Sequence, residues 1–193
     1  MARRITIIEG HPDADASRFG RALADAYARG AEAGGHEVRQ IRVAELEFPV
    51  LRSRREWVEC PPAPAIRQSQ EAIAWSDHVV ILYPLWLGTV PALLKAFFEQ
   101  VMRPGFAVGK LIEGKPGPKL LAGRSARVVV SMCMPALVFR CFFSHGLRVV
   151  KQSILGFCGI NPVSATLIGM VGEKDAKLDK WIDRMEALGR VGR

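Results

Sequence analysis

Bulky apolar side chains crowd a short turn between an expected strand and an expected helix. The run 79–82 is continuously apolar, which is typical of a buried parallel strand, and apolar residues at helical spacing follow from position 94. The turn between them consists of Pro84, Leu85, Trp86, Leu87 and Gly88. Ligands of open α/β sheets bind at the carboxyl ends of the strands, where this turn lies. We therefore expect these residues to form a surface for a flat aromatic ligand.

The turn after the first expected strand carries residue types that suit an anion. His11 and Arg18 supply hydrogen-bond donors and positive charge, and Ser17 is a good N-cap for a helix that begins nearby. Free N–H groups and the helix dipole make such a helix start a binding site for phosphate. We expect a phosphate here to anchor a cofactor whose ring lies over the 84–88 turn. An ordinary capped helix start is the alternative explanation of the same residues.

The spacing of apolar residues along the chain indicates that both turns lie between an expected strand and an expected helix. We expect five strands, over residues 4–9, 37–43, 79–83, 127–131 and 160–168. Apolar residues at helical spacing predict helices over 19–33, 66–75, 94–101, 147–158 and 178–185, with glycines ending the first and the fourth. Two stretches, 44–65 and 103–123, are rich in Pro or Gly and are expected to be irregular. Loops of this length are usually functional or flexible.

The alternation of strands and helices predicts one parallel sheet. Five strands suit a flavodoxin-like, doubly wound α/β sheet in the order 2-1-3-4-5, with helices on both faces. The sequence contains no internal repeat, no low-complexity segment and no sign of a second domain. We therefore expect a single domain over residues 1–193.

The composition excludes several classes of function. Apolar residues make up 49% of the chain and charged residues 24%, as in ordinary globular proteins. The net charge is +8, but the basic residues are scattered apart from Arg52, Arg54 and Arg55, and no nucleic-acid motif accompanies them. We expect a solvated basic surface and no nucleic-acid partner.

Neither a membrane segment nor a metal site is expected. No apolar run is long enough to cross a bilayer, and the run 5–8 is too short for a signal peptide. The four cysteines show neither a Cys-x-x-Cys pair nor metal-ligand spacing. We therefore expect a reducing, cytoplasmic compartment.

Taken together and in this order, the two turns resemble the NAD(P)H:quinone oxidoreductases of the flavodoxin-like fold. This group includes the mammalian quinone reductases, the bacterial modulators of drug activity and the ancillary subunits of glutathione-gated potassium efflux systems. The resemblance covers nearly the whole chain. Its most specific parts are 83–98, 103–107, 145–146 and 155–160.

The resemblance implies a role for each matching residue. The flavin phosphate or ribityl chain is expected to contact His11, Ser17, Arg18 and Phe19. The 84–88 turn is expected to lie under the isoalloxazine ring. The loop 132–135, which consists of Met132, Cys133, Met134 and Pro135, is expected to face N1 and O2 of the flavin with its backbone N–H groups, although Pro135 itself has none. His145 is expected to be catalytic, donating a proton or a hydrogen bond to a reduced quinone oxygen.

Two departures from the family pattern affect this site. The family usually has a Gly pair where this chain has Cys133 and Met134, which reduces backbone freedom and adds bulk. The quinone reductases also carry a Tyr six positions before the catalytic His, where this chain has Phe139. A Tyr-His proton pair is therefore impossible, so either the substrate differs from a classical quinone or His145 acts alone.

The implied activity is reduction of quinones or similar electrophiles by NADH or NADPH through a bound flavin, in two successive hydride transfers. The chain length favours FMN, with FAD as the alternative. Family members are homodimers, and 44–65 and 103–123 are the candidate contact segments.

Three other functions remain open at this stage. An electron carrier of the flavodoxin type is usually acidic, so the charge of +8 disfavours it. A flavin-binding regulatory subunit would associate peripherally with a membrane transporter. The segment His11-Pro12-Asp13 also resembles the His-Pro-Asp-Asp-Glu motif of zinc-dependent N-deacetylases, but here the motif is broken after Asp13, and a catalytic zinc usually needs three protein ligands.

Overall fold

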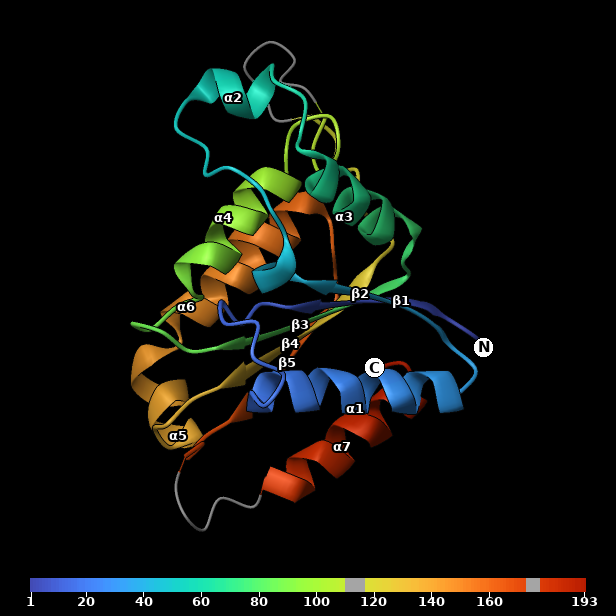
Figure 1. The fold of residues 1–193 in the computed structure, drawn as a ribbon, viewed down its shortest axis with the longest axis vertical. Coiled ribbons are helices and arrows are strands. Elements are labelled where there is room, and N and C mark those ends of the chain that lie inside the picture. The colour runs from blue at the N-terminus through green and yellow to red at the C-terminus, as the bar shows by residue number, and fades with distance from the viewer. Residues whose placement is uncertain (110–116, 173–177) are drawn as a thin grey trace.

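Five parallel strands form one sheet. The computed structural model describes residues 1–109, 117–172 and 178–193. The strands are β1 (Arg4–Glu9), β2 (Glu37–Arg42), β3 (His78–Pro84), β4 (Ser125–Ser131) and β5 (Val163–Ile168). They pair in the order β2-β1-β3-β4-β5 (Figure 1). The predicted flavodoxin-like order is therefore confirmed.

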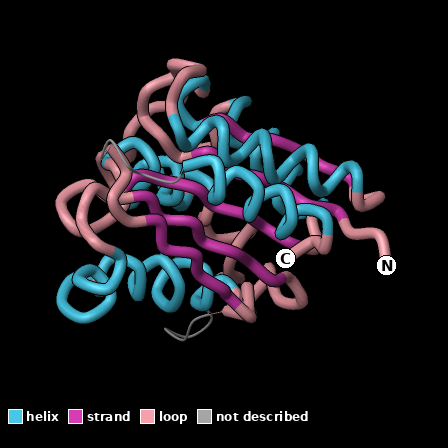
Figure 2. Tube along the Cα trace, turned by 90° about the horizontal axis from the view of Figure 1, so that it is seen from below, coloured by secondary structure: helices cyan, strands magenta, loops and turns pink. Residues whose placement is uncertain are grey.

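Helices cover both faces of this sheet, and Figure 2 shows the strands lying side by side among them. One layer consists of α1 (Phe19–Ala33) and α7 (Leu178–Arg190). The other contains α3 (Pro64–Trp75), α4 (Ala92–Val101) and the helical segment that includes α6 (His145–Arg148). Because β3 lies between the two layers, the residues from His78 to Tyr83 are all buried, which explains its continuous apolar run.

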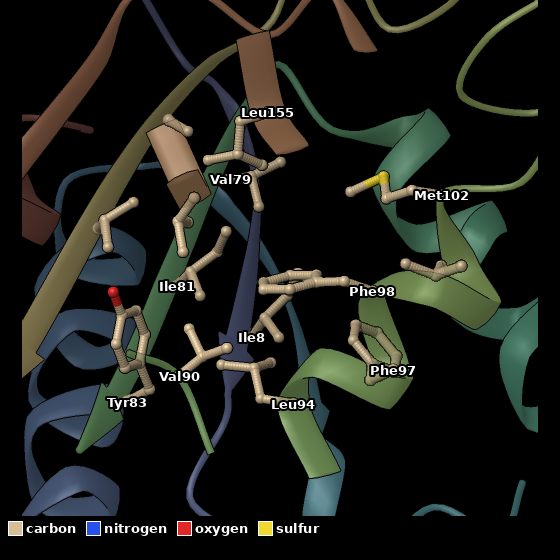
Figure 3. Packing of buried hydrophobic residues seen from close by; sticks show 14 of the residues in the cluster. Ile8, Val79, Ile81, Tyr83, Val90, Leu94, Phe97, Phe98, Met102 and Leu155 are labelled. Carbon is tan, nitrogen blue, oxygen red and sulfur yellow. The ribbon is translucent and has the colours of Figure 1, made fainter. Parts of the chain in front are cut away.

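Alternate residues of β3 face different helices. Val79 and Ile81 belong to the core under α4, and Val80 and Leu82 to the core under α1. Figure 3 shows Leu94 and Phe98 of α4 lying against the first of these cores. Packing on both faces fixes the heights of the strands, so the turns that follow β1, β3 and β4 meet at one edge of the sheet.

The stretch 44–65 is more regular than expected. A single helical turn (Val43–Glu45) follows β2, and a short helix, α2 (Arg54–Val58), stands apart from the sheet (Figure 1). Ser53 caps α2, because its Oγ accepts the N–H of Glu56 at 3.2 Å. The next helix begins at Pro64 rather than at residue 66, since proline fits the first turn of a helix. The prediction of a wholly irregular stretch is wrong here.

The boundaries of other elements also differ from the predicted ones. The helix predicted over 147–158 belongs to a longer helical segment that starts after Pro135: α5 (Ala136–Val138), π-type turns over Phe139–Phe143, α6, and π-type turns over Val149–Gly156. Its predicted end at Gly159, where φ is +101°, is confirmed. In the irregular stretch 103–123, residues 110–116 lie outside the described residues. Among the described helices, none has the length and apolar character needed to span a membrane.

Candidate functional site

The turn after β3 holds two large apolar side chains out in solvent. The N–H of Trp86 donates to the carbonyl of Thr89, and the N–H of Thr89 donates back, both at 3.0 Å. Leu87 and Gly88 between them have φ values of +46° and +79°, as in a type I′ turn. A non-glycine residue in this region stores about 1–3 kcal/mol of strain. Trp86 and Leu87 are 48% and 105% exposed, so the strained turn presents an apolar surface to solvent.

This turn also presents free backbone donors. Within the described residues, the N–H groups of Leu87 and Gly88 make no hydrogen bond. The turn is anchored from below, because the N–H of Leu85 donates to the carbonyl of Ser131 at 2.8 Å. It can therefore offer an apolar surface and two donors to one ligand.

Gly146 places the predicted catalytic residue against the same turn. A Cβ at Gly146 would lie 2.1 Å from the carbonyl oxygen of Gly88 and 2.7 Å from Cα of Thr89. Only glycine allows the start of α6 to approach so closely. His145, which is exposed, consequently stands beside the turn. The sequence pointed to His145-Gly146 only through the family resemblance and gave no steric reason for the glycine.

The turn after β1 reaches the same place. The N–H of Gly10 donates to the carbonyl of Leu82 at 2.7 Å, which ties the turn to β3. The ring of His11 meets the ring of Trp86 edge to face, with centroids 6.3 Å apart and planes at 77°. His11 Nδ1 accepts the N–H of Asp13 at 3.0 Å, so neutral His11 carries its proton on Nε2. The two turns that the sequence singled out are therefore neighbours.

Ser17 does not cap the first helix, and this prediction is wrong. The N-cap of α1 is Arg18, and no side chain caps the helix. Two aspartates organise the turn instead: the N–H of Asp15 donates to Asp13 Oδ1 at 3.0 Å, and the N–H of Ser17 donates to Asp15 Oδ1 at 2.9 Å. These N–H groups lower the pKa of both carboxyls. Because these hydrogen bonds hold residues 13–17 in turns, the helix begins only after Ser17.

The start of α1 keeps free donors all the same. In the described part of the chain, the N–H groups of Phe19 and Gly20 have no partner. They lie at the positive end of a 15-residue helix. Arg18 is less free than its sequence position suggests, because its Nε donates to Asp13 Oδ2 at 2.8 Å. A phosphate here would depend on the backbone more than on the guanidinium.

The third turn, after β4, is held by the end of β5. The N–H of Met132 donates to the carbonyl of Ile168 at 2.8 Å, and the N–H of Val171 donates to that of Met132 at 3.0 Å. The N–H groups of Cys133 and Met134 have no partner among the described residues. The loop 132–135 thus offers backbone donors despite lacking the Gly pair. Met132 is buried, whereas Cys133 and Pro135 are exposed.

Phe139 belongs to the core. Its ring has no exposed surface and packs in the cluster under α4 and the 145–158 segment. The position where the resemblance expects a proton-donating Tyr therefore presents no group to a ligand. His145 is the predicted proton donor that remains exposed.

Sequence reasoning missed a buried ionic group directly behind the first turn. Arg21 lies 3.2 Å from Glu9 Oε2 through its Nε and donates from Nη2 to Glu45 Oε1 at 2.7 Å. Burial raises the pKa of the Glu9 carboxyl. The available signal was a single carboxylate, Glu9, at the end of an otherwise apolar strand.

A cavity elsewhere in the protein does not coincide with these turns. A cavity of about 510 Å³ lies between the segment 51–57, α4 and the end of the 145–158 segment. None of the residues predicted to bind the cofactor lines it, so the candidate site is identified by its exposed apolar groups and free N–H groups. Within 1–109, 117–172 and 178–193, no three His, Cys, Asp or Glu side chains gather as a metal site. Among these residues, His11 therefore does not belong to a group of three possible metal ligands, the number that a catalytic zinc usually needs.

Comparisons with known proteins agree with this architecture. The family model described as flavodoxin-like fold matches residues 3–188. An uncharacterized NAD(P)H oxidoreductase of Haemophilus influenzae is 31% identical over 189 residues, which cover 94% of this chain and 91% of the relative.

Solved structures share the fold. An NAD(P)H:quinone oxidoreductase from Methanothermobacter marburgensis has a TM-score of 0.79 at 20% identity, with 100% of both chains covered. An FMN-dependent NADH-azoreductase from Bacillus anthracis, solved with FMN, has a TM-score of 0.69 at 16% identity, with 98% of this chain and 99% of that chain covered.

Proposed function

The chain belongs to the NAD(P)H:quinone oxidoreductase family of the flavodoxin-like fold, and from this premise we propose that it binds FMN and reduces quinones or similar electrophiles. Membership makes it an NAD(P)H-dependent oxidoreductase. One observation carries the rest of the proposal: three turns at one edge of the sheet present N–H groups without a partner among the described residues, together with the exposed side chains of Trp86 and Leu87.

The residues present fit a flavin with a phosphate tail. The N–H groups of Phe19 and Gly20, which have no partner among the described residues, would hold the phosphate, and His11 Nε2–H would be a further donor. Trp86 and Leu87 would cover the ring and exclude water from it. The donors for its polar edge are the free N–H groups of Leu87, Gly88, Cys133 and Met134.

When bound, the flavin supplies hydride transfer in two successive steps, from NADH or NADPH and then to the acceptor. The protein's own contributions are binding, charge stabilisation and a proton. The N–H groups of the 132–135 loop would hold the polar edge of the ring and favour negative charge there. His145 donates a hydrogen bond or a proton to the oxygen of the reduced acceptor. Because position 139 holds a buried Phe instead of a Tyr, His145 acts without a Tyr partner there.

FMN is the proposed cofactor because the structural neighbour from Bacillus anthracis is named FMN-dependent and holds FMN. FAD is the alternative. We also propose that two copies form a homodimer, with contacts from 44–65 and 103–123, and that the enzyme works in the cytoplasm. A regulatory subunit of a transporter would bind flavin without turnover, so the same assays distinguish the two functions.

The test begins with the visible absorption spectrum of the purified protein and the mass of any released chromophore. The protein is then titrated with FMN and with FAD, and oxidation of NADH and of NADPH is followed with and without a quinone. We expect a yellow protein that releases FMN and turns over a reduced nicotinamide continuously only when an acceptor is present. A folded preparation that stays colourless and binds neither flavin contradicts the proposal.

A further inference from the structure

A buried ion pair closes the base of the turn that carries His11. Glu9 is the last residue of β1, and Arg21 lies in the first turn of α1, so the two residues flank the segment 10–18. They are 4% and 8% exposed, with Arg21 Nε 3.2 Å from Glu9 Oε2. Figure 1 shows α1 beginning at the edge of the sheet where α5 and α6 lie. The pair therefore lies directly behind the candidate phosphate site.

The pair is part of a small network that fixes the direction of the guanidinium. Nη2 of Arg21 donates to Glu45 Oε1 at 2.7 Å, and Glu45 belongs to the turn that follows β2. Two carboxylates from separate segments thus hold one side chain of α1. Desolvation offsets much of the Coulomb attraction of a buried pair, so such a network contributes geometry more than stability.

The backbone of the same residue connects this network to the free donors. The N–H of Arg21 donates to the carbonyl of Arg18 at 2.9 Å. The two residues between them, Phe19 and Gly20, carry the unpaired N–H groups. A shift or tilt of the start of α1 would therefore move the Arg21 side chain and displace both N–H groups together.

We propose that Glu9 and Arg21 are positioning residues that aim the N–H groups of Phe19 and Gly20 at the phosphate of the cofactor. The inference rests on the proposed function, because it requires a flavin with a phosphate. It assigns a role to two charged side chains that touch no ligand themselves.

The test compares FMN with riboflavin, which has the same ring and no phosphate. Dissociation constants are measured by fluorescence quenching for Glu9→Gln, Arg21→Met and the double variant Glu9→Met/Arg21→Met. We expect the dissociation constant for FMN to rise about tenfold in each variant, while that for riboflavin stays within about twofold. The double variant has no unpaired buried charge, so it is expected to stay folded.

Arg29→Met is the matched control. Arg29 lies on the same helix, is 58% exposed through its side chain and approaches Glu186 only to 3.9 Å. We expect both flavins to bind this variant as they bind the unmodified protein.

Two results would overturn the inference. One is an equal loss of affinity for FMN and riboflavin, which would indicate general loosening of the fold, and the other is unchanged FMN binding. If a single variant fails to fold, the double variant and Arg21→Lys carry the same comparison.

If the unmodified protein binds neither flavin, the proposed function itself is contradicted. In that case the role toward the phosphate is lost with the proposed function, and amide hydrogen exchange over 11–21 tests only whether the pair orders the start of α1: exchange faster in Arg21→Met than in Arg29→Met supports this ordering, and equal exchange contradicts it.

Discussion

Trp86 is an aromatic side chain that the fold keeps half exposed at the edge of the sheet. Trp86→Ala should weaken FMN binding about tenfold, because the variant loses the apolar cover of the ring. The measurement is FMN retention on gel filtration and a fluorescence titration. Trp57→Ala, at the partly exposed tryptophan of α2, is the control and should leave binding unchanged. Full occupancy in Trp86→Ala would remove Trp86 from the site.

His145 stands beside the turn without belonging to it. His145→Ala should lower kcat/KM for a quinone about 100-fold, in the range of a lost general acid, and leave FMN affinity unchanged. Stopped-flow absorbance separates flavin reduction by the nicotinamide, which should be unaffected, from reoxidation by the quinone, which should slow. Arg148→Ala, one turn further along the helix, is the control. Equal reoxidation rates would show that the imidazole takes no part.

At the scale of elements, α6 can approach the turn between β3 and α4 only because residue 146 is a glycine, which has no side chain. Gly146→Ala places a Cβ 2.1 Å from the carbonyl of Gly88, so we expect a loss of about 1–3 kcal/mol in the free energy of unfolding. Urea denaturation measures it. The control is Gly20→Ala, where a Cβ meets nothing within 4 Å and a gain of about 0.5–1 kcal/mol is expected. Similar values for the two variants would mean that the contact is not tight.

The start of α1 illustrates how neighbouring side chains can move an element boundary. Ser17 satisfies the sequence rule for an N-cap, but Asp13 and Asp15 take up the nearby N–H groups first. Such local competition depends on the backbone path of the whole turn, which residue type alone does not determine.

At the scale of the molecule, the edge of the sheet opposite the candidate site has a structural role. His78 begins β3 at the edge opposite the three turns, is 4% exposed, and has its Nδ1 2.7 Å from Ser125 Oγ. Burial lowers the pKa of His78 from 6.5 to about 4, with help from the positive charges of Arg3 and Arg127. The folded protein therefore resists protonation of this imidazole.

The lowered pKa of His78 makes the stability of the folded protein depend on pH. Between pH 6.5 and about 4 the unfolded chain binds a proton at His78 that the folded chain does not, so stability should fall as the pH drops through this window. The loss attributable to His78 approaches about 3 kcal/mol below pH 4. Urea denaturation of His78→Gln against pH should show a flatter profile, whereas the exposed-site control His145→Gln should follow the unmodified protein. Parallel profiles for all three proteins would contradict the assignment.

The sequence by itself determined the five strands, the main helices between them and their order. Periods of two and of 3.6 residues report which face of a segment is buried, and short parallel connections limit the topology, so β2-β1-β3-β4-β5 followed from local pattern. The glycine that ends the long helical segment and the positions of Trp86 and His11 near the carboxyl edge followed in the same way.

Only the tertiary structure decided which groups of those turns meet. The contact of Gly146 with Gly88, the edge-to-face rings of His11 and Trp86, and the pairing of Arg21 with Glu9 join residues far apart in the chain. Periodicity carries no information about such contacts, because they depend on how the helices of the two layers pack against the sheet. For the same reason the free N–H groups of the three turns became visible only once the hydrogen bonds around them were known.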